Sequence, residues 1–146
     1  MTEQPAPGHL EVTGKQVVEC GGLSFEATFR APAGATLRVS GELDGQPTEL
    51  FRFDDFIEGP HYHVPADGPA IAFDRAQLGE PLAWYVSQLR DHLAELLTEA
   101  GFSRLVPDID FRAVAEHADD ITQAMTACVP DGYSREPGVG LRMSPA

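Results

Sequence analysis

Polar and apolar residues alternate over several short stretches in the first half of the chain. Residues 23–31 and 35–43 show it most clearly, and 52–54 and 61–64 follow the same rule. Alternation with a period of two is typical of β-strands that bury one side. Turns rich in Gly and Pro separate the stretches, so neighbouring strands should be antiparallel. With 9–20 and 70–74, the pattern predicts a meander sheet of about five to seven strands over residues 9–75.

The second half of the chain changes to the helical period. Apolar residues spaced by three and four positions run through 80–101 and again through 110–129, as expected of helices with one buried face. Strands followed by helices indicate a single α+β domain over 9–146, with two C-terminal helices on the apolar face of the sheet. Residues 1–8 are expected to form a flexible arm. Residues 130–146 are expected to form a loop-rich tail, with a short edge strand at 139–143.

The register of the strands around residue 60 follows from the length of the turn between them. If 52–54 and 61–64 form a hairpin, Asp54 lies opposite His61 and Arg52 lies opposite His63. Directly opposed residues share one face of a sheet. The four side chains should therefore project together on the polar face, although a slip of one residue would destroy this arrangement.

The other two hairpins can be given a register in the same way. A three-residue loop at 32–34 would pair Phe29 with Leu37, and one at 44–46 would pair Leu37 with Phe53. The apolar faces of all these strands then coincide, as they should in a real meander. The polar face would carry two rows of side chains: Thr28, Arg38, Arg52 and His63 in one, and Arg30, Thr36, Asp54 and His61 in the other.

Two histidines and a carboxylate on one sheet face are the ligand set of many zinc and non-haem iron sites. His61, His63 and Asp54 therefore form a candidate site for a divalent metal, Zn or Fe, with Asp67, Asp55 and Glu58 as substitutes for the third ligand. In an enzyme, either histidine would also be a natural acid or base near neutral pH. The competing interpretation is a structural face, in which Arg52 and Asp54 hydrogen-bond the histidines.

The arginines of the same face suggest a ligand class. Arg38 and Arg52, with Asp54, His61 and His63, form a candidate binding site for a small anionic molecule, because the guanidinium fork matches carboxylates and phosphates. The alternative is cross-strand pairing of the arginines with Glu26, Glu42 and Asp54. The sequence thus predicts a domain that binds a small ligand, with or without metal-assisted catalysis. The second prediction is a non-enzymatic accessory or protein-interaction module.

The net charge of the chain limits the classes of partner that we expect it to bind. A formal net charge of −13 and a pI of about 4.5 argue against nucleic acid and anionic membranes, and favour a basic protein partner. No apolar run could span a bilayer and no signal peptide is evident, so the cytoplasm is expected. Cys20 and Cys128 are predicted to be thiols there. Exposed sheet edges predict a homodimer.

The segment Arg-Phe-Asp-Asp-Phe-x-x-Gly-Pro-His-Tyr-His, residues 52–63, resembles a motif of small bacterial domains of unknown function. Some distantly similar proteins lie in toxin–antitoxin loci. The resemblance implies a recurring small fold and no particular activity. The His-x-His pair is also similar to a cupin motif, but Asp67 stands where that motif has Glu. The upstream glycine and a second motif are missing, and the helical half does not suit a cupin.

Overall fold

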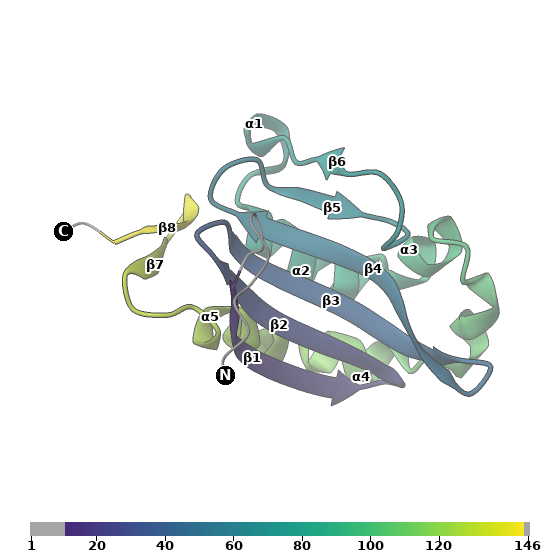
Figure 1. The fold of residues 1–146 in the computed structure, drawn as a ribbon. Coiled ribbons are helices and arrows are strands. Elements are labelled where there is room, and N and C mark those ends of the chain that lie inside the picture. Colours follow the sequence, from purple (N-terminus) through teal and green to yellow (C-terminus); the bar gives the residue numbers. More distant parts are fainter. Residues whose placement is uncertain (1–10, 145–146) are drawn as a thin grey trace.

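A computed structural model of the chain describes residues 11–144. The predicted arm at 1–8 lies outside this range. Six strands form one antiparallel sheet in sequence order, which confirms the predicted meander (Figure 1). The strands are β1 (Glu11–Cys20), β2 (Leu23–Ala31), β3 (Gly34–Leu43), β4 (Gln46–Phe56), β5 (His61–His63) and β6 (Ile71–Ala72).

Helices follow the sheet, as expected, but each predicted long helix is divided in two. The breaks lie at His92, whose φ of −134° is not helical, and at His117, whose φ is −99°. The helical elements are α1 (Arg75–Leu78), α2 (Pro81–Asp91), α3 (Leu93–Glu99), the 3-10 helix η1 (Ser103–Asp108), α4 (Phe111–Glu116) and α5 (Ala118–Ala127). Of these helices, none is long and apolar enough to cross a bilayer.

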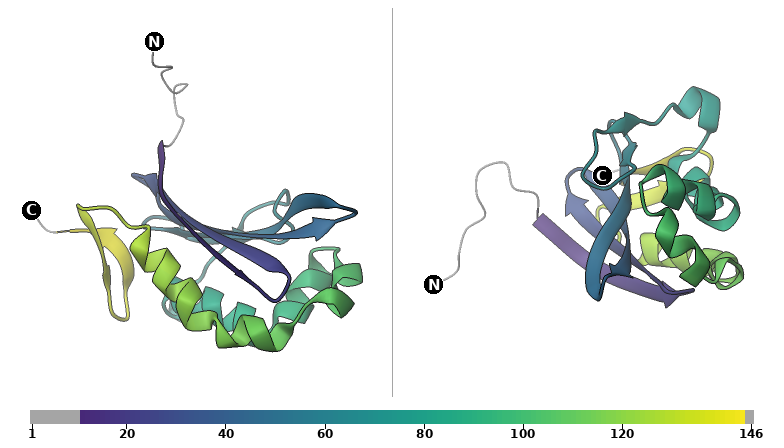
Figure 2. Two further views of the ribbon diagram at one scale, coloured as in Figure 1. Left: turned by 90° about the horizontal axis from the view of Figure 1, so that it is seen from below. Right: turned by 90° about the vertical axis from the view of Figure 1, so that its right-hand side faces the viewer.

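Helices α2 to α5 lie together on one side of the sheet (Figure 2). The Glu80 side chain caps the start of α2 by accepting hydrogen bonds from the backbone N–H groups of Leu82 and Ala83. Asp110 caps α4 in the same way, with a hydrogen bond from the N–H group of Ala113. These carboxylates satisfy donors that a helix start leaves unpaired. The sheet face beneath the helices supplies the apolar side chains of the core, among them Phe25, Phe29, Leu37, Val39, Phe51 and Phe53, all without solvent exposure. The protein is therefore an α+β domain with one open sheet face.

The register between β4 and β5 is the one predicted from the turn length. Asp54 pairs with His61 and Arg52 pairs with His63. Leu37 pairs with Phe53, also as predicted.

The register between β2 and β3 differs from the prediction by two residues. Phe29 pairs with Ala35 rather than with Leu37. A shift of two residues keeps every side chain on its expected face. Its consequence is that Glu26, not Thr28, lies opposite Arg38. Thr28 instead belongs to the row that contains Thr36, Asp54 and His61.

A bulge interrupts β4 directly before the part that faces β5. The pairing with β3 shifts between Val39 and Ser40, so that Leu50 and Phe51 are both fully buried. Strict alternation would have turned Leu50 toward the polar face. A bulge resolves this conflict by adding one residue to a strand. It places Glu49 opposite Ser40, on the open face beside Arg38.

The chain ends in a small hairpin of two strands, β7 (Tyr133–Glu136) and β8 (Gly140–Met143). The predicted strand at 139–143 therefore exists, but it pairs with β7 instead of extending the main sheet. Tyr133 packs on Phe29 with ring centroids 4.7 Å apart, and Leu141 is buried. These contacts fasten the hairpin to the end of the domain.

Candidate metal centre

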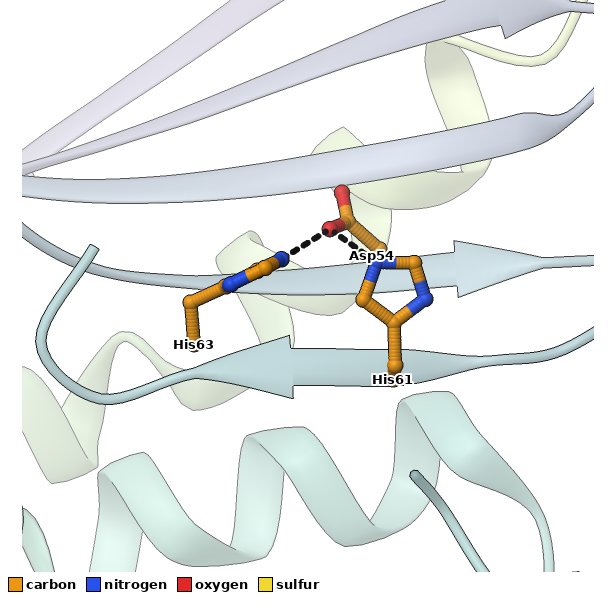
Figure 3. Close-up of side chains that lie close together, drawn as sticks. All are labelled: Asp54, His61 and His63. Atoms are coloured by element: carbon orange, nitrogen blue, oxygen red, sulfur yellow. Dashed lines mark ion pairs between the residues drawn. The ribbon is translucent and has the colours of Figure 1, made fainter. Parts of the chain in front are cut away.

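Strands β4 and β5 bring Asp54, His61 and His63 together on the open face (Figure 3). Oδ2 of Asp54 lies 3.0 Å from Nε2 of His61 and 3.5 Å from Nε2 of His63. The Asp54 side chain is 3% exposed, whereas His61 is 23% and His63 14% exposed. The carboxylate is thus buried at the base of the site, and the imidazoles form its solvent-accessible rim.

Backbone carbonyls hold both imidazole rings in place. Nδ1 of His61 lies 2.9 Å from the carbonyl oxygen of Gly59, and Nδ1 of His63 lies 2.8 Å from that of Gly68. A carbonyl oxygen can only accept a hydrogen bond, so each Nδ1 must carry the proton. In a neutral imidazole the other nitrogen is then unprotonated. Both Nε2 atoms therefore direct a lone pair at the Asp54 carboxylate.

Three electron-rich atoms that converge in this way need a positive charge between them. Either a proton on Nε2 or a metal cation can supply it. The ligand atoms lie within 4.8 Å of one another, and the spacing around a zinc ion with bonds of about 2.0–2.2 Å is roughly 3–4 Å. Histidine ligands of metals usually donate their other N–H to a carbonyl or carboxylate, and both histidines do so here.

The Asp54 carboxylate has a further fixed partner. The Thr36 hydroxyl, which is fully buried, donates a 2.9 Å hydrogen bond to Oδ1 of Asp54. This bond leaves Oδ2 as the oxygen that faces the histidines. Carboxylate ligands of metals are commonly oriented by such hydrogen bonds.

Behind the site, Tyr85 of α2 connects the two strands that carry the candidate ligands. Its hydroxyl lies 3.1 Å from the carbonyl oxygen of Asp54 and 3.3 Å from that of His61. The ring stacks on Phe53 with centroids 4.7 Å apart. Burial raises the pKa of Tyr85 far above its ordinary value, and the nearby Asp55 and Asp54 carboxylates act in the same direction. The hydroxyl therefore keeps its proton and remains a donor to both strands.

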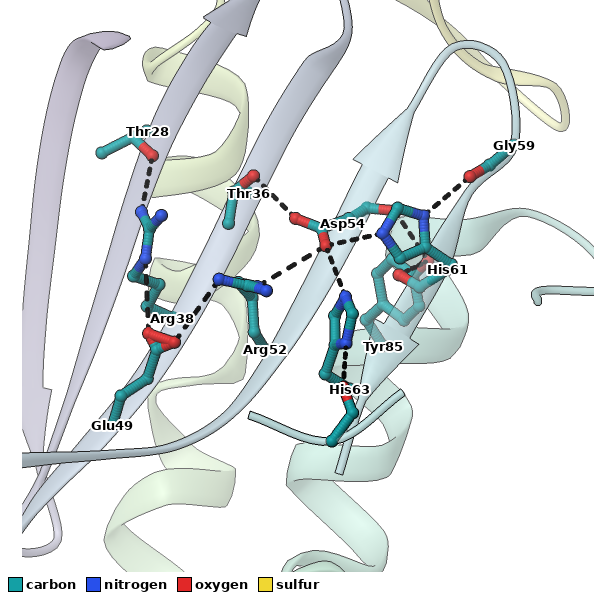
Figure 4. A network of polar contacts seen from close by, with 11 residues as sticks. Thr28, Thr36, Arg38, Glu49, Arg52, Asp54, Gly59, His61, His63 and Tyr85 are labelled. Carbon is teal, nitrogen blue, oxygen red and sulfur yellow. Dashed lines mark hydrogen bonds and ion pairs between the residues drawn. The ribbon is translucent and has the colours of Figure 1, made fainter. Parts of the chain in front are cut away.

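Two arginines continue the polar network away from the histidines (Figure 4). Arg52 lies 3.6 Å from Oδ2 of Asp54 through Nε and 3.6 Å from Glu49 through a terminal nitrogen. Arg38 lies 3.4 Å from the other oxygen of Glu49, and its guanidinium also donates to the Thr28 hydroxyl at 3.5 Å. Glu49 thus bridges two guanidinium groups whose residues pair directly across the sheet.

Asp55, the next residue after Asp54, points to the opposite side of the sheet. It forms a 2.5 Å ion pair with Arg135 of β7, and its side chain is 1% exposed. Burial raises the pKa of Asp55 above its ordinary value, and the Arg135 guanidinium opposes this rise. Arg135 also donates to the carbonyl oxygen of Met125 at 2.9 Å. This pair anchors the C-terminal hairpin and excludes Asp55 as a ligand of the candidate site.

The structure places the predicted site residues together, and their roles remain predictions. Arg52, Asp54, His61 and His63 share one face, and Arg38 lies beside Arg52. The described residues hold one cluster of potential metal ligands, Asp54 with His61 and His63, so Asp67 and Glu58 do not belong to it. Sequence reasoning missed Glu49 as the partner of the arginines. The adjacent apolar residues Leu50 and Phe51, which break the alternation, were the available signal of the bulge that places it.

The comparison with known families adds one finding. A family model, described as Domain of unknown function (DUF7700), matches residues 17–125. The chain belongs to this family. The matched range includes the whole of the candidate site, whereas the hairpin β7–β8 with Arg135 lies beyond it. No curated protein and no solved structure matches the chain.

Proposed function

We propose that this DUF7700 domain binds one divalent transition metal, zinc or iron, through Nε2 of His61, Nε2 of His63 and Oδ2 of Asp54. The observation that carries the proposal is the tautomer of the two histidines. Their Nδ1 atoms donate to the carbonyls of Gly59 and Gly68, so in the neutral rings two unprotonated Nε2 atoms face a carboxylate oxygen. A cation at this point would satisfy all three groups together.

Such a centre would leave coordination positions open. Three protein ligands are typical of catalytic zinc sites, and two histidines with one carboxylate are typical of non-haem iron sites. The partial exposure of both histidines supports access by water or a small ligand. A metal there could polarise an oxygen of the ligand or activate a bound water. In an enzyme of this kind, the histidines would act as ligands and the metal-bound water would carry the proton chemistry.

The charges around the centre favour an anionic ligand. Arg52 lies beside Asp54, where its guanidinium would repel a bound cation unless an acid or an anionic ligand compensates it. Glu49 provides part of that compensation. A carboxylate or phosphate bound to the metal could provide the rest, because arginine binds both through its planar fork of donors. We therefore propose a small anionic molecule as the ligand.

The remaining expectations about partners belong to the same proposal. The free thiols of Cys20 and Cys128 are in keeping with a reducing cytoplasm, where the acidic chain could also bind a basic protein.

A homodimer would have to use an exposed edge of the sheet. On β1 that edge carries a bulge between Thr13 and Gln16, and bulges are a common means of preventing edge-to-edge pairing. We therefore place any dimer contact away from this part of β1.

Calorimetric titration of chelator-treated protein with Zn²⁺ tests the proposed centre. We expect one binding site per chain in the wild type. Asp54→Asn should weaken Zn²⁺ binding by at least about tenfold. The neutral amide lacks the negative charge that the Asp54 carboxylate would bring to the metal. Replacement of the exposed His92 by alanine is the matched control and should leave binding unchanged. Equal heats of binding in wild type, Asp54→Asn and His61→Ala/His63→Ala would contradict the proposal.

A further inference from the structure

The open face holds an electrostatic feature that a metal centre alone does not require. Arg38 and Arg52 pair directly across β3 and β4, and both side chains are partly buried, at 26% and 23% exposure. Like charges directly opposite each other destabilise a sheet. Such a pair is explained if an anion lies between the two guanidinium groups. In the structure that anion is the side chain of Glu49.

The contacts of Glu49 with the two arginines are loose. One oxygen lies 3.4 Å from Arg38 and the other lies 3.6 Å from Arg52. Neither guanidinium makes the two-bond, fork-like contact that arginine makes with a well-placed carboxylate. The Glu49 side chain is 30% exposed. It could therefore move into solvent and leave both guanidinium groups to a stronger ligand.

Arg52 connects this position to the metal centre. It faces Glu49 through a terminal nitrogen and Asp54 through Nε, in each case at 3.6 Å. The Nε atom is buried and has no hydrogen-bond partner among the described residues. Because His63 pairs with Arg52 in the ladder, a ligand on the arginines would lie next to the metal ligands.

We infer that the ligand of this site is a short dicarboxylate and that Glu49 holds the place of its second carboxylate. This inference rests on the proposed function: one ligand carboxylate binds the metal, and the other displaces Glu49 between Arg38 and Arg52. Glu49 is then a specificity-determining residue. It competes with every anion that enters the site, so that only a ligand with two anchoring groups displaces it efficiently.

Binding of succinate and butyrate tests this inference, because the two acids differ in one terminal carboxylate. Calorimetry on Zn²⁺-loaded wild type should show tighter binding of succinate. Glu49→Gln should bind succinate roughly fivefold more tightly than wild type or better, since a competing ion pair is removed. Arg38→Gln should bind succinate and butyrate with equal affinity. Glu42→Gln changes the net charge equally at the far end of β3, and should behave as wild type.

The same titrations separate this inference from the metal proposal. Should the protein fail to bind Zn²⁺, the metal proposal falls, and the arginine pair is still tested by succinate binding to metal-free wild type and Glu49→Gln. The inference is overturned if Glu49→Gln, folded and cooperative in thermal melting, binds succinate no more tightly than wild type and Glu42→Gln. It is also overturned if Arg38→Gln keeps the full preference for succinate over butyrate.

Discussion

Nε2 of His61 lies 3.0 Å from Oδ2 of Asp54, the residue directly opposite it in the β4–β5 ladder. Since Gly59 fixes the proton of His61 on Nδ1, this short contact needs a positive charge at Nε2. In the metal-free protein a second proton on the ring can supply this charge. A metal ion would replace that proton, so metal binding at this site should release protons and weaken as the pH falls.

The hydrogen bond from Thr36 to Asp54 should be important for metal affinity. Thr36→Val keeps the size of the side chain and removes the hydroxyl that orients Oδ1 at 2.9 Å. We expect Zn²⁺ affinity to fall about tenfold to a hundredfold. The free energy of unfolding should fall by about 1–3 kcal/mol, because Oδ1 is left buried and unpaired. Calorimetry and urea denaturation measure the two effects.

Thr48, on the neighbouring strand β4, provides the control. The Thr48 hydroxyl donates only to the nearby carbonyl of Gln46, at the far end of the strand from the site. Thr48→Val should therefore keep the Zn²⁺ affinity of the wild type. If both valine variants lowered the affinity equally, Thr36 would have no specific part in orienting Asp54.

The buried ion pair behind the site should be important for stability. Arg135→Ala leaves the Asp55 carboxylate buried at 1% exposure without its ion-pair partner, and we expect a loss of about 3–5 kcal/mol in the free energy of unfolding. Arg142 lies on the same hairpin and pairs with Glu136 at 47% exposure. Arg142→Ala should change the free energy by only about 0–1 kcal/mol.

The stability lost in Arg135→Ala should depend on pH. Burial raises the pKa of Asp55 in the folded state above its ordinary value of 3.8, and removal of Arg135 raises it further. A carboxyl group with a raised folded-state pKa favours folding at low pH, and this contribution is lost as the pH rises through that pKa. The variant should therefore lose more stability at about pH 7.5 than at about pH 5. An equal loss at both pH values, by urea denaturation, would show that Asp55 is already ionised in the folded variant at about pH 5.

Trp84 should report metal binding directly. It is the only tryptophan of the chain, and its ring centroid lies 5.3 Å from that of Tyr62, the residue between the two histidines. Cu²⁺ binds imidazole strongly and quenches nearby tryptophan emission, whereas Zn²⁺ is redox-inert. We expect Cu²⁺ to quench Trp84 at one equivalent per chain, and Zn²⁺ to reverse it by competition. The double variant His61→Ala/His63→Ala should lose the quenching that is complete at one equivalent of Cu²⁺, and His92→Ala should retain it.

Much of the candidate site follows from the sequence because its residues are close together in the chain. Asp54 and His61 are separated by one short turn, so the turn length and the alternation on either side are enough to place them opposite each other. The same reasoning gave the correct pairing of Leu37 with Phe53. It gave the wrong pairing for Phe29, because the turn occupies residues 31–33 rather than 32–34 and both registers present the same faces.

The features that the sequence did not predict arise from tertiary contacts. Glu49 reaches the arginines only because burial of both Leu50 and Phe51 forces a bulge. Asp55 and Arg135 are 80 residues apart, and no local pattern connects them. The breaks at His92 and His117 occur inside continuous apolar stripes, where periodicity cannot detect a local change of backbone direction.

Elemental analysis of protein purified without an affinity tag and without added metal tests the central proposal most directly. We predict close to one equivalent of zinc or iron per chain in the wild type and in His92→Ala. His61→Ala/His63→Ala should contain almost none while it remains folded by circular dichroism. Substoichiometric metal in the wild type, unchanged in the double variant, would contradict the metal centre formed by Asp54, His61 and His63.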